Sequence, residues 1–71
     1  MPLSEVRTGQ RVKLQAIRAG RSLQARLAAM GLVPGVELEV VSNSLWGPLI
    51  IAIKESRVIL GRGVTEKIEV A

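Results

Sequence analysis

Apolar and polar residues alternate along most of this chain, and the alternation predicts β-strands. Between residues 11 and 17, Val12, Leu14 and Ala16 occupy every second position, with charged or amide side chains between them. A strand with this pattern buries one face and leaves the other in water. Alternation, or a run rich in β-branched residues, predicts four further short strands over residues 36–41, 49–54, 57–60 and 67–70.

The spacing of apolar residues changes to a helical period between residues 22 and 30. Ser22 is a good N-cap residue, because its hydroxyl can accept a hydrogen bond from the first helical turn. Gly31 stands where a helix commonly ends in the left-handed conformation, and Leu32 would then pack back against the last turn. Three residues share one face of this helix and are expected to lie in the core: Leu23, Leu27 and Met30.

Short turns join the predicted elements. Pro34-Gly35 predicts a type II turn, because proline pre-sets φ at the first central position and glycine supplies a positive φ at the second. Glu55-Ser56 is expected to form a two-residue hairpin loop, and single helical turns are expected at residues 2–6 and 64–66. Five short strands with one helix between the first two predict a mainly β domain, a small barrel or sandwich, over residues 1–71.

The chain has no His, Cys, Asp, Tyr or Phe, which removes most of the side chains that build catalytic or metal sites. A general base near neutral pH would have to be a perturbed Glu or Lys, so we expect no catalytic residue and no enzyme. Iron and zinc prefer imidazole, thiolate or carboxylate ligands, and only six Glu are available. Glu37 with Glu39, and Glu66 with Glu69, are interpreted as solvent-facing charge rather than as a weak metal site, and no cofactor is expected.

Ten Lys and Arg residues against six Glu give a net charge of +4, and the cations are dispersed. A solvated surface is the ordinary explanation, but such a charge also favours nucleic acid, an anionic membrane surface or an acidic protein. A small basic nucleic-acid-binding barrel is therefore the alternative function, although Trp46 is the only aromatic residue available for base stacking. No apolar run approaches 18 residues, and with the absence of Cys this predicts a cytoplasmic protein without membrane insertion.

Protein binding fits the residues best. Leu45 and Trp46 form an apolar loop tip of the kind enriched at interfaces, with the alternative that Trp46 folds back over the barrel end. Ile17, Val41 and Ile51 lie on the second strand face, and they predict either a thick core or a patch for a homo-oligomer. The predicted partner-binding residues are Gln24, Arg26, Leu27, Leu32, Val33, Leu45, Trp46 and Arg62.

A series of short motifs follows along the whole chain: Gly9-Gln10, the alternating strand, Arg26-Leu27 in the helix, Gly31-Leu32-x-Pro34-Gly35, Gly47-Pro48-Leu49, Arg57-x-x-Leu60 and Ile68-x-Val70. The order of these motifs resembles the ferrous iron transport protein A (FeoA) domain family. The segment from the helix through Gly-Leu-x-Pro-Gly into the next strand is the most specific part. The resemblance implies a small SH3-like five-stranded barrel with one short α-helix inserted after the first strand.

The resemblance also implies a cytoplasmic accessory protein of bacterial ferrous iron uptake. The expected partner is the membrane ferrous iron permease of the FeoB type, contacted at its cytosolic GTP-binding part. Arg26 or Arg62 acting on the partner's GTP is a less favoured alternative. The same module ends the repressors of the diphtheria-toxin-repressor type, but no helical DNA-binding segment precedes it here, which favours the transport-associated version. Leu45-Trp46 replaces a Gly-Asp pair of many members, and Thr65 replaces a frequent Ala.

Overall fold

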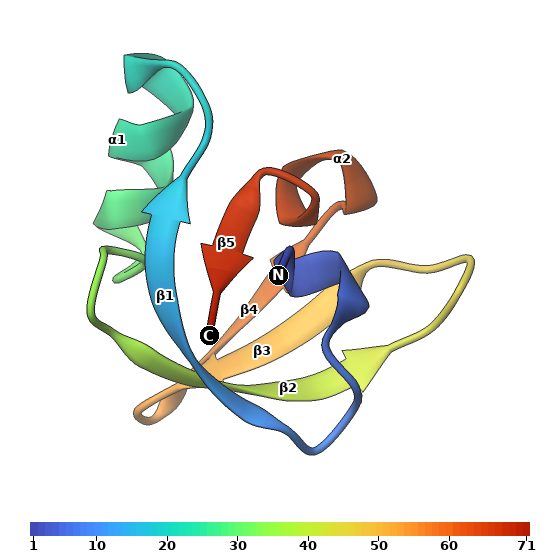
Figure 1. Ribbon diagram of the computed structural model, residues 1–71. Coiled ribbons are helices and arrows are strands. Elements are labelled where there is room, and N and C mark those ends of the chain that lie inside the picture. Colours follow the sequence, from blue (N-terminus) through green and yellow to red (C-terminus); the bar gives the residue numbers. More distant parts are fainter.

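The computed structural model describes all 71 residues and contains five antiparallel strands, one short α-helix and two single helical turns (Figure 1). The strands form one strongly curved sheet around the core, which confirms the mainly β fold with a helix after the first strand. The elements follow in the order η1 (Leu3–Glu5), β1 (Arg11–Ile17), α1 (Arg21–Ala29), β2 (Glu37–Asn43), β3 (Leu49–Ile53), β4 (Ser56–Leu60), α2 (Arg62–Thr65) and β5 (Ile68–Val70).

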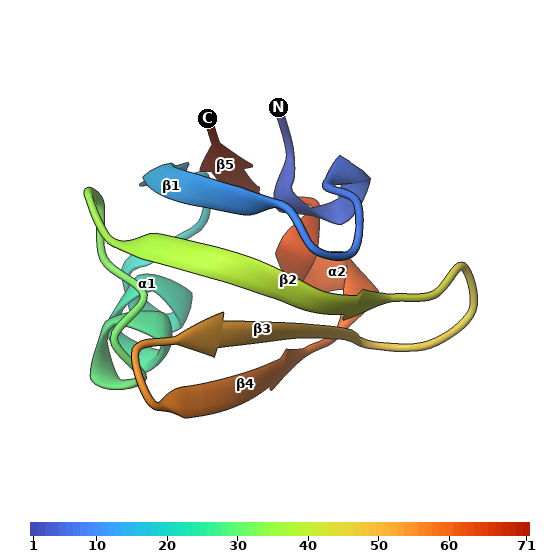
Figure 2. The same cartoon turned by 90° about the horizontal axis from the view of Figure 1, so that it is seen from below.

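The sheet curves into a partly open barrel because β1 pairs with two neighbours over different parts of its length. The strand order is β4-β3-β2-β1-β5, and the first half of β1 pairs with β2 while its second half pairs with β5. The register of the β1–β5 pair shifts between Leu14 and Ala16, and the β2–β3 pair has a similar shift between Val40 and Ser42. Irregularities of this kind increase the local bend and twist of a strand. Figure 2 shows the resulting curvature, with β4 and β5 at the two ends of the sheet.

The two end strands are covered to different degrees. Beside β5, Pro2 forms a bridge with Glu69, and the backbone of Met1 exchanges hydrogen bonds with Val70. The N-terminal residues therefore extend the sheet past β5. The outer side of β4 has no strand neighbour, so one edge of the barrel wall remains open.

Alternation along the strands places the core as the sequence predicts. Val12 and Leu14 of β1 are buried while their neighbours are exposed, and β3 buries every second residue. Each fully buried aliphatic side chain of this kind contributes about 1.5–3 kcal/mol relative to an exposed one. Fourteen buried residues form a single cluster: Leu3, Val6, Val12, Leu14, Leu27, Leu32, Leu38, Val40, Leu49, Ile51, Ile53, Leu60, Ile68 and Val70.

The C-terminal end of α1 confirms the prediction made from Gly31 and Leu32. Gly31 has a φ of +91°, the N–H of Leu32 donates to the carbonyl of Leu27 at 2.9 Å, and the N–H of Gly31 donates to the carbonyl of Ala28 at 2.9 Å. This is the hydrogen-bond pattern of a Schellman motif. It turns the chain so that the side chain of Leu32 is fully buried in the core.

The beginning of α1 differs from the prediction. The helix starts at Arg21, with Gly20 in an extended conformation as the N-cap residue, and no side chain caps the first turn. Because the carbonyl of Gly20 already accepts from the N–H of Gln24, Ser22 lies inside the first turn and cannot cap it. The expected core face is also only partly realised: Leu27 is buried, Leu23 is half-buried, and Met30 is exposed.

The β3–β4 hairpin turns one residue earlier than predicted. Ile53 pairs with Ser56, so the two-residue loop is Lys54-Glu55, and Lys54 adopts a φ of +54°. A loop at residues 55–56 would place Lys54 directly opposite Arg57, and like charges in that position are destabilising.

Two other predicted elements have different bounds in the structure, and one predicted turn is confirmed. The second strand runs through residues 37–43 instead of 36–41, and a four-residue helix over residues 62–65 replaces the single turn predicted at 64–66. The Pro34-Gly35 turn is confirmed, with a φ of +95° at Gly35.

Candidate partner-binding surfaces

Two of the predicted partner-binding residues are in the core. Leu27 is 2% exposed and Leu32 is 0% exposed, so neither offers a side chain to a partner. The reason is the Schellman turn, which folds the chain back beneath the last helical turn and points both leucines inward. Ile51 is likewise buried, whereas Ile17 and Val41 are half-buried, so these three residues do not form an exposed apolar patch.

The remaining predicted residues of α1 are at the surface. Arg26 is exposed, and Val33, just after the helix, is 44% exposed. Gln24 is exposed but not free, because its amide Nε2 donates to the carbonyl of Ala19 at 2.6 Å and to that of Ile17 at 3.3 Å. These two hydrogen bonds connect the first turn of α1 to the end of β1. The hydroxyl of Ser22 contributes no capping hydrogen bond to this turn.

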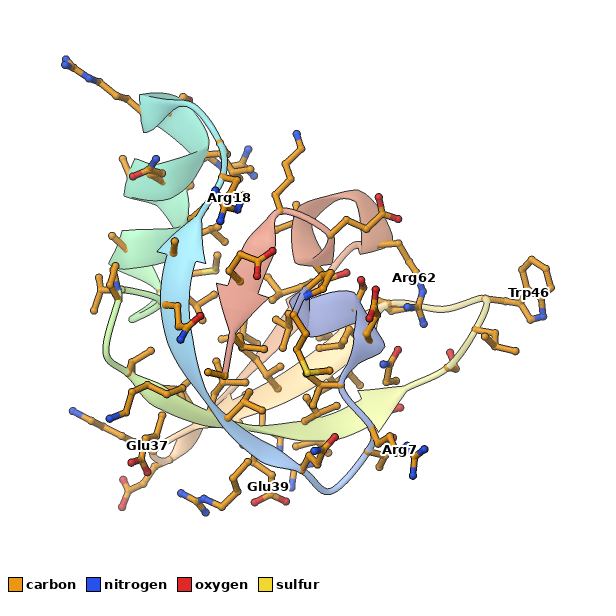
Figure 3. All side chains as sticks on the ribbon, in the orientation of Figure 1. Arg7, Arg18, Glu37, Glu39, Trp46 and Arg62 are labelled. Carbon is orange, nitrogen blue, oxygen red and sulfur yellow. The ribbon has the colours of Figure 1, made fainter.

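Leu45 and Trp46 form the most exposed apolar feature of the molecule. Their exposed fractions are 84% and 96%, and the loop between β2 and β3 carries them away from the barrel. In Figure 3 the indole of Trp46 projects outward, so the alternative in which Trp46 folds back over the barrel end is wrong. The backbone N–H of Gly47 donates to the hydroxyl of Ser44 at 3.0 Å, which stabilises the turn at this tip.

Arg62 is half-buried and has a structural contact. Its Nη2 donates to Oδ1 of Asn43 at 2.7 Å, and Nδ2 of Asn43 donates to the carbonyls of Ser4 and Val6 at 3.1 and 2.7 Å. Nε of Arg62 is buried without a hydrogen-bond partner. The pair therefore joins α2, the end of β2 and the N-terminal turn. No local sequence pattern predicts this contact, because the two residues are 19 positions apart and belong to different elements.

A groove that sequence reasoning missed lies between α1, the end of β4 and α2. It has a volume of about 240 Å³. Ile59 and Met30 are its most exposed apolar residues, at 68% and 43%. The groove is lined by Leu23, Arg26, Leu27, Met30, Ile59, Leu60, Gly61 and Val64. One signal was present in the sequence: residues 58–60 are three apolar residues in succession on a strand, so at least one of them must face away from the core.

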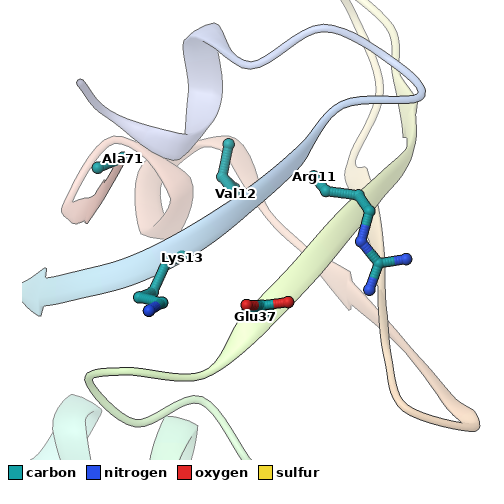
Figure 4. A pocket seen from close by; sticks show the side chains of 5 residues that line it. All are labelled: Arg11, Val12, Lys13, Glu37 and Ala71. Carbon is teal, nitrogen blue, oxygen red and sulfur yellow. The ribbon is translucent and has the colours of Figure 1, made fainter.

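A second hollow of about 240 Å³ lies where β1 and β2 meet the C-terminal residue (Figure 4). It is lined by Arg11, Val12, Lys13, Glu37 and Ala71, and Glu37 is its only acidic side chain. Of the other three members of the two carboxylate pairs, Glu39 lies 3.7 Å from Arg11 and Glu69 lies 3.3 Å from the N-terminal amine, whereas Glu66 is exposed and has no ion pair. The chain contains no group of three or more potential ligand side chains that could hold a metal ion.

The structure thus separates the predicted residues. α1, which contains the groove residue Arg26, and the loop between β2 and β3, which contains Leu45 and Trp46, lie at opposite ends of the molecule (Figures 1 and 2). None of the α-helices is both long and apolar enough to cross a membrane.

A five-stranded antiparallel barrel with a short helix between β1 and β2 places the chain in the class of SH3-like domains. The FeoA domain model matches residues 1–71, and the chain therefore belongs to the FeoA domain family. It is 39% identical over 69 residues to an Fe(2+) transport protein A of Methanocaldococcus jannaschii. The aligned residues cover 97% of this chain and 83% of that protein.

Solved structures agree with the family. A crystal structure of an iron uptake regulatory protein, FeoA, is similar with a TM-score of 0.92 and 31% identity, covering 99% of this chain and 93% of that one. FeoA of Stenotrophomonas maltophilia, described as a prokaryotic SH3 domain protein complexed with zinc, has a TM-score of 0.85 at 22% identity and covers 100% of this chain and 89% of that one. The second likeness shows the fold alone. The family and the first two relatives make this chain a protein associated with ferrous iron transport.

Proposed function

We propose that this chain is a cytoplasmic accessory protein that regulates a ferrous iron permease of the FeoB type by contact with the permease's cytosolic part. Membership of the FeoA family supplies the link to ferrous iron transport. The observation that carries the mode of action is the exposure of large apolar side chains at two separate places, the loop tip of Leu45 and Trp46 and the groove residue Ile59, at exposed fractions between 68% and 96%. Exposed aromatic and aliphatic side chains of this size are typical of protein interfaces.

The residue inventory supports contact rather than chemistry. Catalysis at neutral pH would require a positioned base or nucleophile, and the chain has no imidazole, thiol or phenol group. We therefore assign the regulatory effect to binding: the accessory protein favours whichever state of the permease it binds more tightly. The predicted contact residues that remain are Gln24, Arg26, Val33, Leu45, Trp46 and Arg62.

A titration of the purified chain against the isolated cytosolic part of the permease tests this function. We expect saturable binding with a dissociation constant of about micromolar order, measured by calorimetry. Replacing Trp46 by alanine is expected to weaken binding about 30-fold, which corresponds to the ~2 kcal/mol of an interface hot spot, without lowering stability. Because the side chain is 96% exposed, its removal leaves no cavity.

The control is a parallel titration with a generic single-stranded RNA at low and high salt. A basic nucleic-acid-binding barrel would bind RNA with an affinity that falls steeply with salt concentration. RNA binding of that kind, combined with no affinity for the permease, would replace the proposed function by the nucleic-acid alternative.

A further inference from the structure

The outer edge of β4 has free backbone hydrogen-bonding groups. In the β3–β4 hairpin Ile53 and Ser56 flank a two-residue loop, so Ser56, Val58 and Leu60 direct their N–H and C=O groups toward β3. Arg57 and Ile59 then direct theirs away from the sheet. No other strand pairs with β4, and neither residue forms a backbone hydrogen bond to a turn or loop. An edge of this kind is a template for an additional strand.

The apolar groove runs along this same edge. Ile59 and Leu60 of β4 form one wall, and Leu23, Leu27 and Met30 of α1 form the other. The volume of about 240 Å³ exceeds the roughly 150 Å³ cavity that holds a benzene ring. A strand added to β4 would direct alternate side chains toward this space, and there is room for one large apolar side chain.

Most of the charges around the edge are positive. Arg21 and Arg26 of α1 and Arg57 of β4 belong to the two elements that flank the groove, and the acidic residues next to these elements in the chain are Glu55 in the β3–β4 loop and Glu66 after α2. None of these three arginines has a carboxylate within ion-pair distance, and Arg62 of α2 is not counted with them because its guanidinium donates to Asn43. The surface is complementary to an acidic segment.

We propose that the β4 edge accepts an extended acidic segment of the partner protein as an additional antiparallel or parallel strand, with one bulky apolar side chain of that segment in the groove. The backbone of Arg57 and Ile59 supplies the hydrogen bonds, and the surrounding arginines select acidic residues. This inference rests on the proposed function, because it says how the permease's cytosolic part is bound. A second copy of this chain is a poorer occupant, since pairing two β4 edges would bring their arginines together in two molecules that each carry a net charge of +4.

The decisive variant is Ile59→Pro. Proline lacks the outward N–H but leaves the β3–β4 ladder intact, because Ile59 does not donate to β3. We expect it to weaken binding of the permease's cytosolic part about tenfold or more. Ile59→Thr, which retains the N–H and the branched shape, is the matched control and is expected to lose only about threefold. Amide NMR spectra of each variant report whether the barrel is folded.

Charge is tested by Arg57→Glu, with Arg7→Glu as the control for the same change of net charge outside the groove. Arg7 lies in the loop between η1 and β1. We expect a loss of about tenfold for Arg57→Glu and less than about twofold for Arg7→Glu. In the wild-type chain, the amide hydrogens of Arg57 and Ile59 should exchange more slowly when the partner is bound.

The outcomes separate this inference from the proposed function. If the permease's cytosolic part binds and Ile59→Pro and Arg57→Glu bind equally well, strand addition at β4 is refuted and the proposed function stands. If that part does not bind, the proposed function fails. A titration with a peptide of alternating glutamate and leucine then tests separately whether the β4 edge accepts an acidic strand. Binding with amide shifts at Arg57 and Ile59 supports the strand site, and no binding refutes it. Concentration-dependent protection of the same amides in the chain alone would identify a second copy as occupant and would also refute it.

Discussion

Asn43→Ala is expected to destabilise the fold strongly although Asn43 is a polar residue at the end of a strand. The Asn43 side chain forms three hydrogen bonds, two as a donor to the carbonyls of Ser4 and Val6 and one as an acceptor from Arg62. Removing it leaves two carbonyls and a half-buried guanidinium without these partners, and Nε of Arg62 already has none. A neutral hydrogen bond contributes about 1 kcal/mol and one to a charged group about 1.5–3 kcal/mol.

We therefore expect the free energy of unfolding to fall by about 2–4 kcal/mol, which is a large part of the stability of a chain of this size. For a domain of this length each kcal/mol lowers the melting temperature by about 4–8 °C, so the midpoint should fall by about 8–32 °C. Urea denaturation and thermal melting followed by circular dichroism measure both values. Ser42→Ala is the control, because Ser42 precedes Asn43 on the same strand and has no side-chain hydrogen bond, and it should change stability by less than about 0.5 kcal/mol.

A double-mutant cycle locates the effect in the contact with Arg62. Arg62→Met removes the guanidinium, so the cost of Asn43→Ala should be smaller by about 1 kcal/mol or more in the Arg62→Met background. Two results would refute the idea that this contact joins α2 to the N-terminal turn. One is a free energy of unfolding of Asn43→Ala within about 0.5 kcal/mol of the wild-type value, and the other is a double variant whose loss of stability is the sum of the two single losses.

Two further pairs of variants test the turn after α1. Gly31→Ala should lower the free energy of unfolding by about 1 kcal/mol or more in urea denaturation, because a φ of +91° is strained for any residue with a Cβ. Gly61 has an ordinary φ and open space around it, so Gly61→Ala should be nearly neutral. Equal costs for the two variants would contradict the argument from φ. Leu32→Ala should lower the free energy of unfolding by about 2–5 kcal/mol, because the leucine side chain is fully buried. Val33→Ala should lower it by less than about 1 kcal/mol, because the valine side chain is 44% exposed. A similar melting temperature for both variants would show that Leu32 is not a core residue in solution.

The features that could be predicted from the sequence are those that depend on a few adjacent residues. Gly31 and Leu32 satisfy the last carbonyls of α1 through bonds that span five residues, so the local pattern was sufficient. The N-cap could not be predicted in the same way, because Gly20 and Ser22 are both acceptable N-cap residues. The choice was settled by the extended conformation of Gly20, which is held by the bonds of Gln24 to the end of β1.

The hairpin loop shows where a local rule needs information from the rest of the sheet. Neither Lys54-Glu55 nor Glu55-Ser56 has the usual loop residues. Moving the loop by one residue shifts the pairing by two, so Val58 and Leu60 would face the core with either loop. The two registers differ in their cross-strand pairs, and only the loop at Lys54-Glu55 keeps Lys54 away from the position opposite Arg57.

The candidate surfaces were predictable only in part, because some depend on adjacent residues and others on elements that are distant in the sequence. Exposure of Leu45 and Trp46 follows from a loop rich in turn residues, and the sequence identified both. The groove requires α1 and the end of β4 to lie side by side, although Met30 and Ile59 are 29 positions apart in the chain. That placement results from closure of the barrel, in which the N-terminal residues cover the edge of β5 and leave the edge of β4 open. Because an uncovered apolar edge is a hazard for aggregation, its position beside the unpaired arginines of α1 and β4 favours a binding role for this edge over an accidental gap in the barrel.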